Sequence, residues 1–298
     1  MSVAHAPSRV LVRGIGDDCA VLRPPRGHEL LITTDFSLED VHFRRDWHPA
    51  ECVGHRCLAR GLSDIAAMGG EPLAAFLSLA LPAGLEQRWV NGFLRGLMKL
   101  AKRFNVPLAG GDIAQSPAGV LADIIVVGSV PQRKALLRSG AKPGDALYVT
   151  GALGGSAAAI QQMRAGKKLR PAQNHAHFFP EPRIAVGRLL RERRVASATI
   201  DLSDGLSTDL SHICEESGVG AVVYAESVAK GATLEQALHG GEDYELLFTA
   251  APGTRVPKEI AGVRVTRLGE IIRGDRVFIC DRNGRRKPLP PRGWEHFR

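Results

Sequence analysis

Apolar runs alternate with helix-like patterns along the chain, and this alternation predicts an α/β fold. Strands are predicted over 28–36 (HELLITTDF) and 73–82 (LAAFLSLALP). The segments 50–70 and 85–104 repeat apolar residues at the helical period, so each predicts an amphipathic helix. Elements of both kinds therefore share the N-terminal part of the chain.

The pattern predicts two domains. A short strand leading into a Gly-Gly turn is expected over 105–112, and a further strand over 119–130. The basic, turn-rich segment 131–145 then predicts a boundary. We place an N-terminal domain at 1–135 and a C-terminal α/β domain at 136–298.

The C-terminal part repeats the alternation of strands and helices. A strand precedes the glycine loop 151–156 (GALGGS), which could hold an anion at the N-terminus of the next helix. Another strand ends in TIDLSDG, where Ser203 and Asp204 are expected to cap the helix over 205–218. The segment 240–249 (GGEDYELLFT) contains a later strand.

Composition indicates a globular protein of a reducing compartment. The 298 residues are 44% hydrophobic and 23% charged, and no apolar run is long enough for a membrane span. The first residues lack the hydrophobic segment of a secretory signal. Five scattered cysteines argue against a disulfide framework. We therefore expect a cytoplasmic protein without a membrane partner.

The stretch HPAECVGHRC brings His48, Cys52, His55 and Cys57 close together in sequence. A zinc site is one interpretation, but the spacing matches no usual ligand pattern. Small residues that pack a helix are the better interpretation.

The net charge of +8 suits either nucleic acid or an anionic small substrate. The basic run 281–288 (DRNGRRKP) lacks any nucleic-acid motif, and aromatic residues make up only 5% of the chain. A solvated turn explains that run, so no nucleic-acid partner is expected.

Aspartates recur beside glycine or serine over nearly the whole chain. Asp35, Asp112, Asp201 and Asp204 are expected at or just after strand ends, where α/β folds bind ligands. A turn or a helix cap explains any one of these sequences alone. Asp64 has no such explanation, because it lies inside a helical pattern among apolar neighbours.

Carboxylates that converge repel one another unless a cation neutralises them. Thr33 and Thr34 add hydroxyl oxygens beside Asp35, so the candidate ligands are hard donors that favour Mg²⁺. Mg²⁺ usually brings substrate phosphates with it. No Walker P-loop and no G-x-G-x-x-G fingerprint occurs, so a nucleotide would be held through metal and carboxylates.

Seven motifs occur in the order of one known family: GIGDDCAVL, LLITTDFSLEDVHF, LARGLSDIAAMGGEP, LAGGDI, LLRSGAKPGDALYVTG, TIDLSDGLSTDLSHI and GGEDYELLFT. Together they resemble the thiamine-monophosphate kinase family, within the superfamily of aminoimidazole ribonucleotide synthetase and selenophosphate synthetase. The resemblance implies ATP-dependent phosphorylation of thiamine monophosphate to thiamine diphosphate with several Mg²⁺ ions. It also implies a homodimer whose N-terminal mixed sheets pair into a barrel, and an active site between the two halves.

The resemblance also assigns site residues, position by position. The implied metal ligands are Asp18, Thr33, Thr34, Asp35, Asp64, Asp112, Asp201 and Asp204. The implied ATP contacts are Gly111, Asp112, Arg138 and Ser203. The implied contacts to the thiamine moiety are His42, Glu242 and Trp294.

The implied mechanism is direct in-line transfer without an enzyme nucleophile, supported by Asp35, Asp64, Asp112 and Arg138. The chain departs from the family pattern at Ile113, where the family has threonine, and at Gly61, where it has asparagine. A glycine is a weak point in a helix, so reduced local stability is expected there.

Three alternatives remain open at this point. The chain resembles the wider superfamily too, so another ATP-dependent kinase or synthetase of that superfamily is the nearest one. A noncatalytic sensor of nucleotides or thiamine phosphates is the second. A basic nucleic-acid-binding protein is the third, and it rests on net charge alone.

Overall fold

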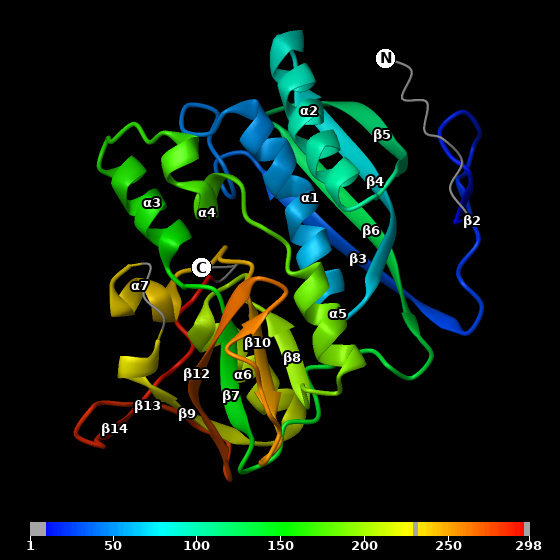
Figure 1. Ribbon diagram of the computed structural model, residues 1–298. Helices are drawn as coiled ribbons and strands as arrows, with labels where there is room; N and C mark the ends of the chain where they lie inside the picture. Colours follow the sequence, from blue (N-terminus) through cyan, green and yellow to red (C-terminus); the bar gives the residue numbers. More distant parts are fainter. Residues whose placement is uncertain (1–9, 229–231, 295–298) are drawn as a thin grey trace. The chain divides into compact units, whose positions relative to one another are not determined.

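The computed structural model describes residues 10–228 and 232–294 (Figure 1). It contains two compact units, the first formed by Met1–Ile65 with Gly70–Lys134 and the second by Ala66–Gly69 with Ala135–Arg298. Both units combine helices with a sheet, as the sequence pattern predicts. In the described ranges, no helix is long and apolar enough to cross a membrane.

The first unit is built on a four-stranded sheet in the order β3-β6-β4-β5. β6 pairs antiparallel with both of its neighbours, and β4 and β5 run parallel. The predicted strands and helices of this region are confirmed. The elements are β1 (Leu11–Arg13), β2 (Val21–Leu22), β3 (His28–Leu38), α1 (Ala50–Ala67), β4 (Glu71–Pro82), α2 (Gln87–Arg103), β5 (Leu108–Ser116) and β6 (Leu121–Pro131).

Glycines allow α1 to approach its neighbours closely. A Cβ at Gly54 would overlap the carbonyl oxygen of Phe93 on α2, and a Cβ at Gly61 would lie 2.6 Å from Cγ2 of Val126 on β6. Gly61, which sequence reasoning treats as a weak point, therefore also lets the helix pack against the sheet.

The other face of this sheet exposes apolar side chains. Leu30, Ile32 and Phe36 alternate along β3 and are 47%, 67% and 54% exposed. Alternate residues of a strand lie on one face, so these three form an apolar row. β3 is also an edge strand of the sheet.

The Gly-Gly turn predicted at 110–111 is wrong. Gly110, Gly111 and Asp112 lie inside β5, opposite Phe76, Leu77 and Ser78 of β4. Gly111 has φ +154°, and a Cβ there would overlap the carbonyl oxygen of Leu77. The pair of glycines therefore permits close strand pairing rather than a reversal of the chain.

The second unit is built on a larger, mainly antiparallel sheet in the order β14-β13-β9-β12-β7-β10-β8, with β11 paired to β12. α6 contributes Leu206, Leu210 and Ile213 to its core. The strands are β7 (Ala146–Thr150), β8 (Ala198–Asp201), β9 (Gly220–Tyr224), β10 (Leu246–Ala250), β11 (Glu259–Ile260), β12 (Val263–Ile272), β13 (Val277–Cys280) and β14 (Arg286–Pro288). The helices are α3 (Gly155–Arg164), η1 (Pro171–Gln173), α4 (His175–Phe178), α5 (Ile184–Glu192), α6 (Leu206–Ser217), η2 (Ala225–Ser227) and α7 (Leu234–His239).

The predicted cap of α6 is wrong in its residues. The N-cap is Gly205, and it makes no side-chain capping bond. Asp209 accepts hydrogen bonds from the amides of Asp204 (3.1 Å) and Gly205 (2.9 Å) instead. An acid inside the first turn thus satisfies two amides that precede the helix, and neither Ser203 nor Asp204 acts as its cap.

Candidate active site

Asp35 and Asp64 meet on the helix-covered face of the first sheet. Asp35 is on β3, Asp64 is on α1, and a side-chain hydrogen bond joins them. Thr33, two residues before Asp35, donates from its hydroxyl to Asp64. Burial, with the charge of Asp64 next in size, raises the pKa of Asp35 to about 7. The group offers two carboxyls and a hydroxyl to a cation.

Arg60 is a cation beside this pair that sequence reasoning missed. It lies one helical turn before Asp64, and its guanidinium donates to the carbonyl oxygen of Phe36. Its charge lowers the pKa of Asp35, against the larger effects of burial and of Asp64. A basic residue four positions before an acid inside an apolar helical pattern was the available signal.

Two other predicted ligands lie on the opposite face of the sheet. The Thr34 hydroxyl donates to Asp123 on β6 at 2.6 Å. Asp123 pairs with Phe36 and Ser78, and Ser78 pairs with Asp112, so these residues form one row on the exposed face. Asp123 was missed, although an acid in the apolar run of β6 was a signal.

The two adjacent aspartates of the GIGDDCAVL segment have different surroundings. Asp17 forms an ion pair with Arg13 at 3.1 Å and accepts from the amide of Asp18 at 3.1 Å. Asp18 is exposed. Asp17 is therefore paired with Arg13, and Asp18 is the residue that the resemblance implies as a metal ligand.

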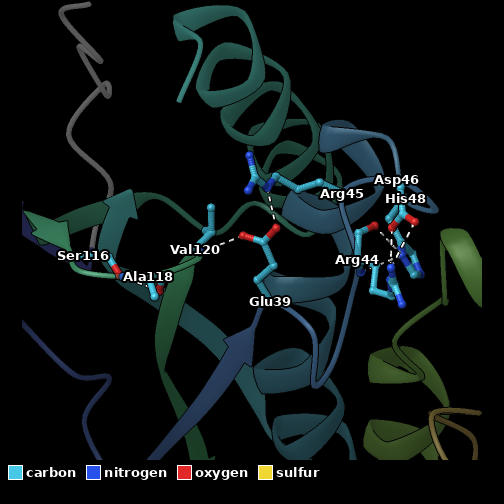
Figure 2. Close-up of polar contacts among 8 residues, drawn as sticks. All are labelled: Glu39, Arg44, Arg45, Asp46, His48, Ser116, Ala118 and Val120. Atoms are coloured by element: carbon cyan, nitrogen blue, oxygen red, sulfur yellow. Dashed lines mark hydrogen bonds and ion pairs between the residues drawn. The ribbon is translucent and has the colours of Figure 1, made fainter. Parts of the chain in front are cut away.

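The loop after β3 carries His42, and Glu39 holds that loop (Figure 2). Glu39 accepts from the amide of Val120 at 2.8 Å and from the guanidinium of Arg45. Its side chain is only 9% exposed. Ser116 and Ala118 bond to each other in the turn before Val120.

A backbone hydrogen bond orients the ring of His42. The amide of Leu38 donates to Nδ1 of His42 at 3.0 Å. Because Nδ1 accepts, the proton of the neutral ring is on Nε2. Nδ1 of His48 lies near both backbone groups of Arg44, 3.1 Å from its amide and 3.0 Å from its carbonyl oxygen (Figure 2).

In the second unit, three aspartates gather where β8 passes into α6. Asp201 ends β8, Asp204 is in the following loop, and Asp209 is on the first turn of α6. Burial first, and then the charges of Asp201 and Asp204, raise the pKa of Asp209 to about 8. Asp209 was not chosen from the sequence, although it stands in the same TIDLSDGLSTDL motif.

Glu242 and Trp294 join the same loop through backbone hydrogen bonds. The amide of Glu242 donates to the carbonyl of Ser203 at 2.7 Å, and the amide of Trp294 donates to the carbonyl of Asp204 at 3.1 Å. Glu242 has φ +64°, a strained backbone conformation typical of functional loops. The structure therefore brings Ser203, Asp204, Glu242 and Trp294 together.

The glycine loop GALGGS, predicted to hold an anion, binds a carboxylate of the protein itself. Asp243 accepts from the amide of Gly154, the N-cap of α3, at 2.8 Å. Burial raises the pKa of Asp243 to about 7, while its bonds to the Gly154 and Ser156 amides oppose that rise. The glycine loop is thus closed by a carboxylate from the GGEDYEL motif.

A buried ion pair supports the strand after that motif. Arg183 donates from Nε to Glu245 at 2.7 Å, with side chains 19% and 7% exposed. Thr150 donates to the same carboxylate at 2.6 Å and accepts from the amide of Leu246 at 2.8 Å. Arg138, in contrast, is exposed, and its carbonyl accepts from Ser217.

The described ranges contain no group of three or more His, Cys, Asp or Glu residues that could hold a metal ion. Cys52 and Cys57 are 1% and 0% exposed on α1, and burial raises the pKa of each thiol to about 12. These cysteines pack a helix, which is the interpretation preferred over zinc.

Two family models match the chain. The N-terminal domain of AIR synthase related protein matches residues 16–130, and the C-terminal domain of that family matches 142–280. Thiamine-monophosphate kinase of Salmonella typhimurium is 38% identical over 305 residues, which cover 95% of this chain and 91% of the relative. The chain belongs to the thiamine-monophosphate kinase family.

Solved structures of the thiamine-monophosphate kinase family have the same fold. Thiamine-monophosphate kinase from Stenotrophomonas maltophilia K279a superposes with a TM-score of 0.84 at 34% identity, covering 91% of each chain. AaThiL complexed with AMPPCP and TMP superposes with a TM-score of 0.82 at 32% identity, covering 92% of this chain and 89% of that one. The resemblance seen in the motifs is therefore confirmed.

Proposed function

We propose that this enzyme transfers the γ-phosphoryl group of ATP to thiamine monophosphate, giving thiamine diphosphate and ADP. The observation that carries the proposal is 38% identity to a thiamine-monophosphate kinase over nearly the full length of both chains. The fold shared with AaThiL complexed with AMPPCP and TMP supports the same pair of substrates.

The residues at Asp35 and Asp64 fit Mg²⁺. They offer two carboxyls and the Thr33 hydroxyl, and burial, followed by the charge of Asp64, raises the pKa of Asp35. Mg²⁺ typically takes one or two protein carboxylates and completes its shell with water and substrate phosphates. A protein site without a third carboxylate therefore suits this ion. The other ligands that we assign to Mg²⁺ ions are Asp18, Thr34, Asp112, Asp201 and Asp204.

The reaction needs no enzyme nucleophile. An oxygen of the thiamine monophosphate phosphate attacks the γ-phosphorus of ATP, a new P–O bond forms, and the bond to the β-phosphate oxygen breaks to release ADP. Bound Mg²⁺ would neutralise and align the phosphate oxygens. The acceptor oxygen is already anionic near neutral pH, so Asp35 and Asp64 act as ligands and not as bases. The exposed guanidinium of Arg138 is free to reach a phosphate.

We assign the remaining contacts from the family resemblance. His42, whose ring is oriented by the amide of Leu38, is assigned to the thiamine moiety. Trp294 offers a flat ring for stacking, and Glu242 is assigned to the same moiety. Gly111, Asp112 and Ser203 are assigned to ATP.

Residues 1–135 are assigned to ATP and metal binding and to dimerisation, and residues 136–298 complete the site. The apolar row of Leu30, Ile32 and Phe36, on a long edge strand, supports a homodimer formed through this sheet. Pairing of two such sheets into a barrel would bury that row.

The function is tested by incubating the protein with ATP and Mg²⁺ and offering either thiamine monophosphate or thiamine. We expect thiamine diphosphate and ADP in equal amounts from thiamine monophosphate, and no phosphorylation of thiamine. ADP release with neither acceptor converted would point to another substrate of the superfamily. Binding of both ligands without product would support the sensor alternative.

A further inference from the structure

The C-terminal segment 289–294 crosses the first turn of α6; we call it the strap (the red end of the ribbon in Figure 1). It begins at Leu289, which is 5% exposed in the core of the second unit and donates from its amide to Val277. Pro290 and Pro291 follow and limit the backbone freedom of the strap. It therefore leaves the core with few accessible conformations.

Two side-chain hydroxyls of α6 receive the strap. Thr208 accepts from the amide of Gly293 at 3.0 Å, and Ser207 accepts from the amide of Arg292 at 3.3 Å. The next amide, that of Trp294, donates to the carbonyl of Asp204 at 3.1 Å. Three consecutive amides of the strap are thus bonded to α6 and to the loop before it.

The strap also fits α6 sterically. A Cβ at Gly293 would overlap the carbonyl oxygen of Asp204 and lie 2.6 Å from Oγ1 of Thr208. Only glycine allows the strap to lie this close. Glu235 on α7 adds an ion pair to Arg292 at 3.1 Å.

From this geometry we infer that Thr208 and Gly293 are positioning residues, which hold Trp294 against the Asp204 loop so that its ring meets thiamine monophosphate. The inference rests on the proposed function, since it assigns Trp294 to that substrate. Thr208 itself touches no reacting atom. Its effect reaches the substrate through the strap, so it acts on substrate affinity and not on the transfer step.

The test compares Thr208→Val with wild type by steady-state kinetics. Removing one hydrogen-bond acceptor should raise KM for thiamine monophosphate about three- to tenfold. KM for ATP and kcat should change less than twofold. Thr208→Ser keeps the hydroxyl and should restore the wild-type KM. Ser211→Ala is the matched control, because that hydroxyl bonds only within α6, to the carbonyl of Thr208 at 2.6 Å.

A double-mutant cycle separates positioning from a general loss of structure. In a Trp294→Ala background, Thr208→Val should change KM for thiamine monophosphate less than twofold, since the ring that it positions is gone. A full and additive effect in that background would overturn the inference. So would equal increases of KM for both substrates, because these would indicate a disturbed α6.

Gly293→Ala tests the close approach of the strap to α6. It should raise KM for thiamine monophosphate as much as Thr208→Val does, or more. If it fails to fold, Arg292→Ala tests the anchoring of the strap through the ion pair to Glu235 instead; that side chain is 58% exposed, and the same increase of KM is expected. Hydrogen exchange at the Gly293 and Trp294 amides gives a readout that needs no activity. Thr208→Val should speed exchange there at least fivefold, and unchanged exchange would overturn the inference. Wild type that forms no thiamine diphosphate would overturn the proposed function, while the exchange result would still decide whether Thr208 docks the strap.

Discussion

The carboxyl groups of Asp35 on β3 and Asp64 on α1 are hydrogen-bonded to each other. Burial, and then the charge of Asp64, raise the pKa of Asp35 to about 7, so Asp35 holds a proton below that pH in the metal-free protein. This relationship links the packing of α1 on the sheet to the proposed chemistry.

The metal-free protein should lose stability as the pH rises from about 4 to about 7. Across this window folded Asp35, with its pKa raised to about 7, keeps a proton that the unfolded chain releases. Stability falls wherever the folded state binds more protons, by at most about 1.4 kcal/mol per pH unit for each such group. Asp243 and Asp209 act in the same direction up to about pH 7 and pH 8. Urea unfolding in EDTA at several pH values measures the slope.

Asp64→Asn removes the second-largest cause of the raised pKa of Asp35, so the slope of its stability against pH should become shallower. Asp46→Asn is the control, because Asp46 is exposed in an ion pair with Arg44. Stability that rises between pH 5 and pH 7 in EDTA would contradict the account of this pair.

Periodicity predicted the elements of the first unit well. The helical period of α1 reveals the face that it buries, and the apolar run of β3 predicts a strand, although its alternating apolar residues Leu30, Ile32 and Phe36 are the exposed ones. Family motifs then placed Asp35 and Asp64 in the candidate site. Local pattern and motif were enough to select Asp35 and Asp64, because both lie in long apolar or amphipathic segments.

Pairings between distant segments could not be read from the sequence. Gly110 and Gly111 have the composition of a turn, yet the approach of Leu77 makes them part of a strand. Asp209 is the acceptor at the start of α6, in place of Ser203 or Asp204, because it reaches back to the amides of Asp204 and Gly205. Contacts between residues that local sequence patterns do not reveal determine both structures, so a single sequence does not predict them.

Glu245→Gln should destabilise the protein by about 3–5 kcal/mol, because it leaves the buried guanidinium of Arg183 without its charge partner. The free energy of unfolding in urea at pH 7 measures the loss. Glu86→Gln is the control, since its partner Arg88 is 85% exposed and the change should stay within about 0.5 kcal/mol. Equal losses of unfolding free energy in the two variants would contradict the claim that burial of the Arg183–Glu245 pair makes it important for stability.

Gly54→Ala should destabilise the first unit, contrary to the usual gain of about 1 kcal/mol for such a change inside a helix. The new Cβ would overlap the carbonyl of Phe93, so α1 and α2 must move apart at a cost of about 1–3 kcal/mol. Gly155→Ala is the control, because its Cβ would meet only Ala176 at 3.6 Å. A stabilised Gly54→Ala protein would contradict the observed helix packing.

Ile32→Lys should convert the proposed dimer into a monomer. Ile32 is 67% exposed in the apolar row of β3, and a charge there would be buried without a partner in the interface. Light scattering during size exclusion measures the mass of each species. Val12→Lys, on β1, replaces another exposed apolar residue and should stay dimeric. A wild-type monomer at micromolar concentration would contradict the dimer.

The central claim is that carboxylate-bound Mg²⁺ supports phosphoryl transfer to thiamine monophosphate. The most direct measurement is formation of thiamine diphosphate from thiamine monophosphate and ATP, with and without Mg²⁺, by wild type and Asp64→Asn. We predict product only from wild type with Mg²⁺, and a loss of at least about 100-fold in the variant. Product formed without divalent metal, or at the wild-type rate by Asp64→Asn, would contradict the claim.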